Sequence, residues 1–139
     1  MLQNKNLSIE EINEQNWKEY QKTLSENYEN TWDYVAITAT NQVQKEQYEQ
    51  EIESRKSKNL LPTKTKFIVI ADYQEKRIGS GGATLNVLRH LKENIKNFNE
   101  KKILIINSGG DSKRIPQYSV TGKVFLPIQR TLPDNRIST

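Results

Sequence analysis

Apolar residues gather in three short continuous runs, and the stretches between these runs are polar with apolar residues at helical spacing. The three runs are 32–39, 66–71 and 102–106. Continuous apolar runs of this length are typical of strands in a parallel sheet that is covered on both faces. Because helical stretches separate the runs, the order of elements predicts an α/β fold with a parallel sheet core.

Three helices are predicted around these strands. The first covers 8–29, where Ser8 and Glu11 form a capping box. The second is polar, is capped by Thr40 or Asn41 and ends near Lys58. Its weak apolar side consists of Val43, Tyr48 and Ile52.

The third helix covers 83–98, with a regular apolar spacing at Leu85, Leu88, Leu91, Ile95 and Phe98. A short strand or edge segment is expected at 124–126, and a loop beyond Pro127.

All six glycines of the chain fall in three short runs, within 79–84, 109–114 and 122–123. Glycine lets the backbone turn and approach a ligand without a Cβ in the way. All three runs contain or adjoin Lys or Arg, and backbone N–H groups combined with cations suit a polyphosphate. Ligands of parallel sheets bind at the carboxyl ends of the strands, where the second run lies. The glycine runs therefore predict a phosphate-binding site.

The second run is the main candidate, and it follows the most apolar strand directly. Its candidate phosphate-binding residues are Ser108, Gly109, Gly110, Asp111 and Ser112, followed by the cations Lys113 and Arg114. Arg can bridge phosphate oxygens in a bidentate way, whereas Lys acts as a mobile point charge. A plain strand-to-loop turn with two surface cations remains the alternative.

The first run supplies Gly81, Gly82 and Thr84 as further candidates, because a helix N-terminus with free N–H groups binds anions. A glycine-rich entry that lets the helix pack closely on the sheet is the alternative.

Two familiar motifs are excluded. The P-loop pattern before Lys123 fails at Gln117 and Val124, and the dinucleotide fingerprint that would start at Gly79 fails at Thr84.

The charge distribution agrees with an anionic ligand near the glycine runs. Residues 1–60 carry a net charge of −4, residues 61–100 of +3 and residues 101–139 of +5. No basic stripe with interleaved aromatic residues indicates nucleic-acid binding. No apolar run approaches the length of a membrane span. The chain has no cysteine, which favours a reducing, cytoplasmic compartment.

Other polar residues offer weaker candidates. His90 is the only histidine and is expected to be solvated or structural. Asp33 and Asp72 are expected to serve as turns or caps at strand ends. Asp111 could meet a metal ion held by phosphates, but one carboxylate does not define a magnesium site.

Taken together, these runs resemble the L-fucose-1-phosphate guanylyltransferases (GDP-fucose pyrophosphorylases). The resemblance extends over about residues 32–127 and is carried by Trp32–Val35, Arg77–Leu88, Asn107–Ser119 and Gly122–Phe125. The resemblance is strongest to the N-terminal part of the bifunctional enzymes that fuse this activity to a fucokinase. Of the wider signature Gly-Gly-x-Gly-Thr-Arg, the chain matches Gly109, Gly110 and Arg114. Ser112 and Lys113 replace its Gly and Thr, and Ser at that place is usual in the fucose branch.

The resemblance implies a Rossmann-like nucleotide-diphospho-sugar transferase fold and a reaction of GTP with L-fucose 1-phosphate. Its products are GDP-L-fucose and pyrophosphate, and the implied cofactor is Mg²⁺. Lys113 and Arg114 would hold the β- and γ-phosphates and the departing pyrophosphate. Lys123 would contact the α-phosphate or the sugar phosphate. These three cations are the expected catalytic residues.

The resemblance also implies a longer parent protein. Residues 1–31 are expected to be an N-terminal helical segment, and 32–139 the N-terminal part of a truncated nucleotidyltransferase domain. The expected partners are GTP, a sugar 1-phosphate and the rest of the parent chain with a C-terminal kinase domain, and neither nucleic acid nor a membrane. The piece alone is expected to be inactive. Two alternatives stay open: part of a protein known mainly as an ATP-dependent fucokinase, or a non-catalytic nucleotide-binding module.

Overall fold

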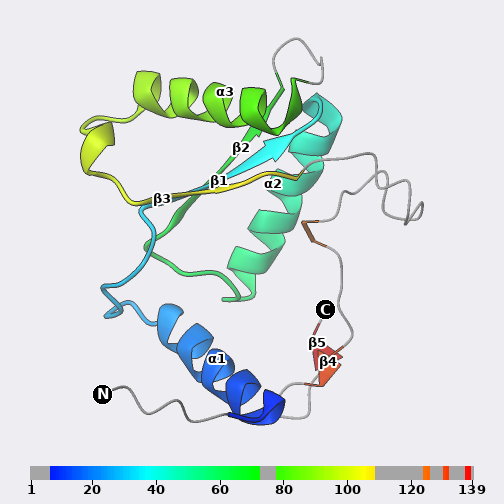
Figure 1. The fold of residues 1–139 in the computed structure, drawn as a ribbon, viewed down its shortest axis with the longest axis vertical. Coiled ribbons are helices and arrows are strands. Elements are labelled where there is room, and N and C mark those ends of the chain that lie inside the picture. Colours follow the sequence, from blue (N-terminus) through cyan, green and yellow to red (C-terminus); the bar gives the residue numbers. More distant parts are fainter. Residues whose placement is uncertain (1–6, 73–77, 109–123, 126–129, 132–136, 139) are drawn as a thin grey trace.

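The computed structural model describes residues 7–72, 78–108, 124–125, 130–131 and 137–138. Its centre is a three-stranded parallel sheet in the order β2-β1-β3 (Figure 1). The strands are β1 (Tyr34–Ala39), β2 (Lys66–Ala71) and β3 (Ile103–Ile106). Tyr34 is in register with Lys66 on one side and with Ile103 on the other. The α/β class and the parallel sheet are therefore confirmed, and the carboxyl ends of all three strands meet at one edge.

Helices α2 (Gln42–Ser57) and α3 (Gly79–Asn94) cover opposite faces of the sheet (Figure 1). Successive side chains of a strand point to opposite faces, so β1 supplies both cores. The core under α2 consists of Val35, Ile37, Ala39, Tyr48, Ile52 and Val69. The core under α3 consists of Ala36, Ile70, Val87 and Leu91. Burying one large aliphatic side chain contributes about 1.5–3 kcal/mol, so these two small clusters stabilise the sheet between the helices.

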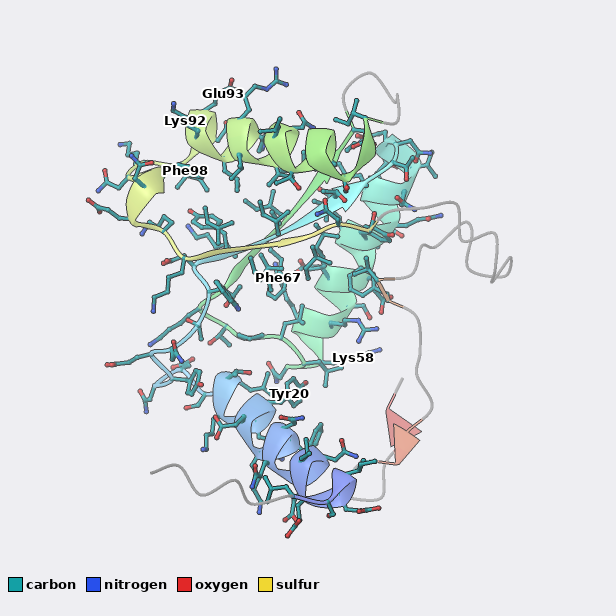
Figure 2. The ribbon with its side chains drawn as sticks, in the orientation of Figure 1. Tyr20, Lys58, Phe67, Lys92, Glu93 and Phe98 are labelled. Carbon is teal, nitrogen blue, oxygen red and sulfur yellow. The ribbon has the colours of Figure 1, made fainter. Side chains whose placement is uncertain are left out.

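Helix α3 begins and ends four residues earlier than the predicted range 83–98. Gly79 has a φ of +71° and starts the helix, so the glycine run forms its first turn instead of preceding it. The helix ends before Ile95 because that residue is extended and Asn97 is left-handed, with a φ of 54°. Phe98 lies in a separate 3₁₀ helix, Phe98–Glu100, and still packs against the core under α3 (Figure 2).

The buried side of α3 also differs from the expected one. Ala83, Val87 and Leu91 face the sheet, whereas Leu85 and Leu88 are exposed. Both sets follow helical spacing, and the small Ala83 allows the helix to approach the sheet closely. His90 is exposed on this helix, as expected.

Helix α2 matches its prediction. The Asn41 side chain accepts a hydrogen bond from the Gln44 backbone N–H at 2.8 Å and caps the helix. Tyr48 and Ile52 are its buried residues, as the sequence indicated, but Val43 is exposed.

Helix α1 (Ile9–Thr23) lies beside the amino-terminal edge of the sheet and has no buried residue. The capping box of Ser8 and Glu11 is present. The helix ends at Thr23 instead of near 29, because the following residues form turns with a Tyr28 N–H to Ser25 carbonyl bond of 3.1 Å. Tyr20 points toward the end of α2 and donates a hydrogen bond of 3.0 Å to the Leu60 carbonyl (Figure 2).

Toward the C-terminus the structure corrects two predictions. Val124 and Phe125 lie in a turn packed against the core under α2, not in a strand. Their apolar character reflects this packing. Beyond Pro127, where a loop is expected, β4 (Arg130–Thr131) and β5 (Ile137–Ser138) pair in an antiparallel ladder. Leu126 lies outside the described residues.

Candidate functional site: the carboxyl edge of the sheet

A hydrogen bond joins β1 and β3 at the carboxyl edge of the sheet. The Ser108 backbone N–H donates to the Thr38 Oγ1 at 3.0 Å, and both residues are buried. Thr38 is the second-last residue of β1, and Ser108 comes just before the second glycine run. This bond fixes Ser108 at the edge where parallel sheets bind ligands.

The first glycine run reaches the same edge. The Asn107 side-chain amide donates to the Thr84 Oγ1 at 3.3 Å, and the Thr84 hydroxyl donates to the Ser80 carbonyl at 2.9 Å. Asn107 follows β3 and Thr84 lies in α3 close to its N-terminus. The structure therefore brings Thr84 to Asn107, the residue before Ser108, although the two lie 23 residues apart in the sequence.

A second contact holds the start of α3 against β2. The Asn86 side-chain amide donates to the Ala71 carbonyl at 3.1 Å, and the Asp72 backbone N–H donates to the Ala39 carbonyl at 2.8 Å. The end of β2 is thus tied both to β1 and to α3. This places the first turn of α3 beside the strand ends.

The N-terminus of α3 has the properties of an anion site. Its N-cap residue Ile78 makes no side-chain capping bond, and its first turn contains no acidic residue. By contrast, Asn41 caps the N-terminus of α2, and the Gln44 side chain accepts bonds from the Thr40 N–H and hydroxyl at 2.8 and 3.0 Å. Since the N-terminus of α2 already has these local partners, the positive end of α3 is the better position for a phosphate.

Gly81 and Gly82 have different surroundings. A Cβ at Gly81 would meet nothing within 4 Å, so local packing does not require glycine there. A Cβ at Gly82 would lie 2.8 Å from the Ile78 Cβ, so Gly82 serves close packing of the chain. This contact is with the residue before the helix and not with the sheet, so it does not decide between the two interpretations of the first run, and Gly81 remains a ligand candidate.

Seven of the expected site residues lie outside the described residues. They are Gly109, Gly110, Asp111, Ser112, Lys113, Arg114 and Lys123. Their roles in phosphate binding and catalysis stay predictions.

Sequence reasoning assigned Tyr48 only to the core and did not connect it with the site. Tyr48 is 1% exposed, and its hydroxyl has no hydrogen-bond partner among the described residues. Burial raises the pKa of Tyr48, and the neighbouring Ser108 side chain acts in the opposite direction. The two side chains are close but do not reach the geometry of a hydrogen bond. No local sequence signal marks this proximity, because it depends on how α2 packs on the sheet.

An open hollow of about 550 Å³ lies at the other end of β2 and includes Lys56, Thr65 and Lys66 in its lining. Lys66 is placed over the Tyr34 ring at 5.8 Å, and Lys56 pairs with Glu53 at 3.5 Å. Because both cations already have partners, this hollow is a weaker anion site than the carboxyl edge.

Within the described ranges, no three His, Cys, Asp or Glu side chains gather in a way that could hold a metal ion. In the same part of the chain, no helix is long and apolar enough to cross a membrane.

Comparison with known proteins identifies what the chain resembles. Residues 95–139 match the family model of the fucose pyrophosphorylase domain. The mouse fucose-1-phosphate guanylyltransferase is 39% identical over 95 residues, covering 68% of this chain and 16% of that protein. The human enzyme of the same name is 38% identical over the same shares. The Arabidopsis thaliana bifunctional fucokinase/GDP-fucose pyrophosphorylase is 31% identical over 126 residues, covering 76% of this chain and 12% of that protein.

These matches confirm the resemblance to fucose-1-phosphate guanylyltransferases and GDP-fucose pyrophosphorylases. The chain spans less than a fifth of the length of these relatives. No solved structure matches it.

Proposed function

We propose that the chain is part of a fucose-1-phosphate guanylyltransferase that makes GDP-L-fucose and pyrophosphate from GTP and L-fucose 1-phosphate. The observation that carries the proposal is the similarity to two proteins of that name over 68% of the chain. The fold proposed for the complete domain is the Rossmann-like nucleotide-diphospho-sugar transferase fold. The described α/β part, with its parallel sheet, is compatible with that fold.

The strand order supports a ligand site between β1 and β3. From β1 the chain passes through α2 to β2 on one side, and β3 lies on the other side of β1. Such a reversal of strand order opens a crevice at the carboxyl ends of the two strands that flank it, here β1 and β3, and α/β proteins bind ligands at such a position. The bond from Ser108 to Thr38 lies at this position. Ser108, which precedes Gly109 in the sequence, thus lies beside this position.

The chemistry requires positioning and charge neutralisation, and no protein nucleophile. An oxygen of the sugar phosphate attacks the α-phosphorus of GTP in line, and the bond to the β-phosphate bridging oxygen breaks as pyrophosphate leaves. In the proposal Lys113 and Arg114 hold the β- and γ-phosphates. Lys123 contacts the α-phosphate or the sugar phosphate. The paired glycines Gly109 and Gly110 let the backbone approach the nucleotide.

The start of α3 is the second part of the proposed site. Gly81 leaves open space over the first helical turn, and Thr84 ties that turn to Asn107. An anionic oxygen placed there would accept hydrogen bonds from free backbone N–H groups of the first turn. Asp111 and Ser112 complete the set of proposed nucleotide contacts.

Mg²⁺ is expected from the resemblance, but the described residues do not provide a site for it. It therefore enters the proposal only as a requirement, to be tested by omitting the metal from the assay.

A longer parent protein with a kinase domain is also part of the proposal. The name of the Arabidopsis relative, which includes fucokinase, supports it. A cytoplasmic location is proposed as well and can be tested by cell fractionation.

Calorimetric titration of the chain with GTP and with ATP, each with Mg²⁺, tests the proposal. We expect GTP to bind more tightly than ATP. Preference for ATP would favour the sugar-kinase alternative. Binding of both nucleotides without turnover in any longer form of the protein would favour a non-catalytic module. For the chain alone we expect no pyrophosphate release, and release at a rate normal for a transferase would contradict that expectation.

Charge variants test the phosphate contacts. Replacing Lys113 or Arg114 by Ala should weaken GTP binding about 10- to 100-fold, the usual value of a hydrogen bond to a charged group. Lys58→Ala is the matched control, since it removes one exposed positive charge at the carboxyl end of α2. A similar loss of GTP affinity in the control would show that the loss comes from long-range electrostatics and not from direct contacts with the phosphates.

A further inference from the structure

Strand β2 lies at one edge of the three-stranded sheet, in which β1 is its neighbour on the inner side. In a parallel ladder, alternate residues of a strand direct their backbone N–H and C=O groups to the same neighbour. The Lys66 N–H donates to the Asp33 carbonyl at 2.9 Å, so the even-numbered residues of β2 face β1. The backbone N–H and C=O groups of Phe67, Val69 and Ala71 therefore face outward.

Of these three residues, only Ala71 has an outward backbone partner within the described ranges. Its carbonyl accepts the bond of 3.1 Å from the Asn86 side-chain amide. In the same part of the chain, the outward N–H and C=O groups of Phe67 and Val69 make no hydrogen bond. Unpaired donors and acceptors along an apolar edge strand form a template for pairing with another extended chain.

The open hollow of about 550 Å³ lies along this edge, at the amino end of β2. Phe67 and Ile68 form part of its lining, and the connection from α2 to β2 supplies most of the other residues. The connection starts with a tight turn, in which Asn59 has a φ of 53° and the Leu60 N–H donates to the Arg55 carbonyl at 2.9 Å. One wall of the hollow is thus formed before any partner binds.

The segment that forms the hollow is strongly basic. Lys56 and Lys66 belong to its lining, and their partners leave the positive charge available. The ion pair of Lys56 with Glu53 is exposed, and such pairs are weak, whereas the Tyr34 ring near Lys66 carries no net charge. From residue 54 to residue 71 the chain has no acidic residue, and its cations are Arg55, Lys56, Lys58, Lys64 and Lys66. Negative charges spread along an extended chain complement this segment.

We propose that the outer edge of β2 binds an extended acidic peptide of a partner protein, which adds a strand to the sheet at Phe67 and Val69. In this mode of recognition main-chain hydrogen bonds supply affinity, and alternate side chains supply specificity. Apolar side chains of the peptide enter the hollow beside Leu61, and its carboxylates meet Lys56 and Lys66. The inference does not rest on the proposed function, because the hollow lies at the end of β2 opposite the carboxyl edge.

Charge also argues against a second copy of the chain as the occupant. Pairing of β2 with β2 of another copy would bring two basic segments side by side. Like charges on paired strands destabilise the pairing. An acidic strand meets no such repulsion.

Amide hydrogen exchange tests the edge directly. Without a ligand, the outward Phe67 amide should exchange about 10-fold or more faster than the Ile68 amide, which faces β1. The probe is a capped peptide of about six residues that alternates glutamate and valine, the length of a typical strand. It should slow exchange at Phe67 and Val69 and leave Ile68 unchanged. Equal exchange of the Phe67 and Ile68 amides in the free chain, or no slowing with the peptide, would overturn the proposal.

Calorimetry with three peptides separates backbone pairing from charge. The glutamate–valine peptide should bind. The same peptide with every backbone nitrogen methylated should not bind, because it lacks the donors that pair with a strand edge. A lysine–valine peptide should not bind either, because its charge is repelled. Equal affinity of the methylated peptide would exclude strand addition, and equal affinity of the lysine peptide would exclude the acidic partner.

Single-charge variants locate the binding surface. Lys56→Ala and Lys66→Ala should each weaken binding of the glutamate–valine peptide by about 2- to 5-fold. Lys92→Ala is the matched control, since it removes an exposed lysine from the last turn of α3. If neither variant binds the peptide more weakly than this control does, the peptide is not bound at the hollow and the proposal is wrong.

Two further outcomes would assign the edge to another occupant and refute the acidic partner. Self-association in sedimentation, with exchange at Phe67 that slows as the chain concentration rises, would identify a second copy. Slow exchange at Phe67 in a longer form of the protein, without added peptide, would identify a segment of the parent chain. We expect neither result. None of these measurements uses a nucleotide, so a failure of GTP binding would leave this proposal standing.

Discussion

Asp33 and Lys102 lock the amino ends of β1 and β3 together. The Asp33 side chain accepts a hydrogen bond of 2.8 Å from the Lys102 backbone N–H, and the Asp33 N–H donates to the Lys102 carbonyl at 2.9 Å. Lys101 adds an ion pair with the same carboxylate at 3.8 Å. Asp33 thus has a structural role at a strand end, as a link between β1 and β3 instead of the expected turn or cap. It also sets the register that brings Thr38 opposite the chain leaving β3.

Asp33→Ala should therefore destabilise the fold without affecting the phosphate-binding edge directly. It removes a charge-assisted acceptor from one backbone N–H, which costs about 1.5–3 kcal/mol when the bond is well formed and less at this partly exposed position. Urea unfolding measures the loss. Pyrophosphate affinity measured on the folded fraction should stay the same. A large loss of affinity with unchanged stability would contradict a purely structural role for Asp33.

Thr38→Val should lower both stability and phosphate affinity. The substitution keeps the shape but leaves the buried Ser108 N–H without its acceptor, at a cost of about 1–3 kcal/mol. Thr65→Val is the matched control, because Thr65 Oγ1 donates to the Trp32 carbonyl at 2.8 Å at the opposite end of the sheet. Thermal unfolding and pyrophosphate titration of both variants provide the comparison. Equal losses of affinity in the two variants would show that Thr38 acts only through general stability.

Gly81→Ala should stabilise the protein and weaken phosphate binding. The site has open space and no positive φ, so alanine gains about 0.5–1 kcal/mol of helix stability while its methyl group covers the first turn of α3. Gly82→Ala should instead destabilise the protein by about 1–3 kcal/mol, since its Cβ would meet Ile78. Melting temperature and GTP affinity separate the two effects. Unchanged affinity in Gly81→Ala would remove Gly81 from the proposed site.

Tyr48 should make the protein less stable at alkaline pH. Burial raises the pKa of the Tyr48 phenol above its ordinary value of 10.0, so the folded protein keeps a proton that the unfolded chain loses. The unfolded state then binds fewer protons, and stability falls as the pH rises above 10.0 toward the folded-state pKa. Urea unfolding between pH 8 and 11 should show a smaller decline for Tyr48→Phe than for the original protein. Parallel curves would contradict this.

The sequence alone was sufficient for the three strands of the parallel sheet and for the starts of two helices. Each strand is a continuous apolar run, and the Ser8 capping box and the Asn41 cap act on backbone groups within three residues. Such signals are local, so they do not depend on the rest of the fold. The resemblance rested on the order of short runs along the chain, which is also a property of the sequence.

Only the tertiary structure decided which face of α3 is buried and which residues meet at the carboxyl edge. Leu85 and Ala83 both belong to helical stripes, and contact with the sheet selects the stripe of Ala83. Ser108 meets Thr38 across 70 residues, and Tyr48 meets Phe125 across a still longer stretch of the chain. Thr84 and Asn107 lie 23 residues apart. Contacts between residues so far apart follow from strand order and helix packing, which no local pattern of side chains encodes.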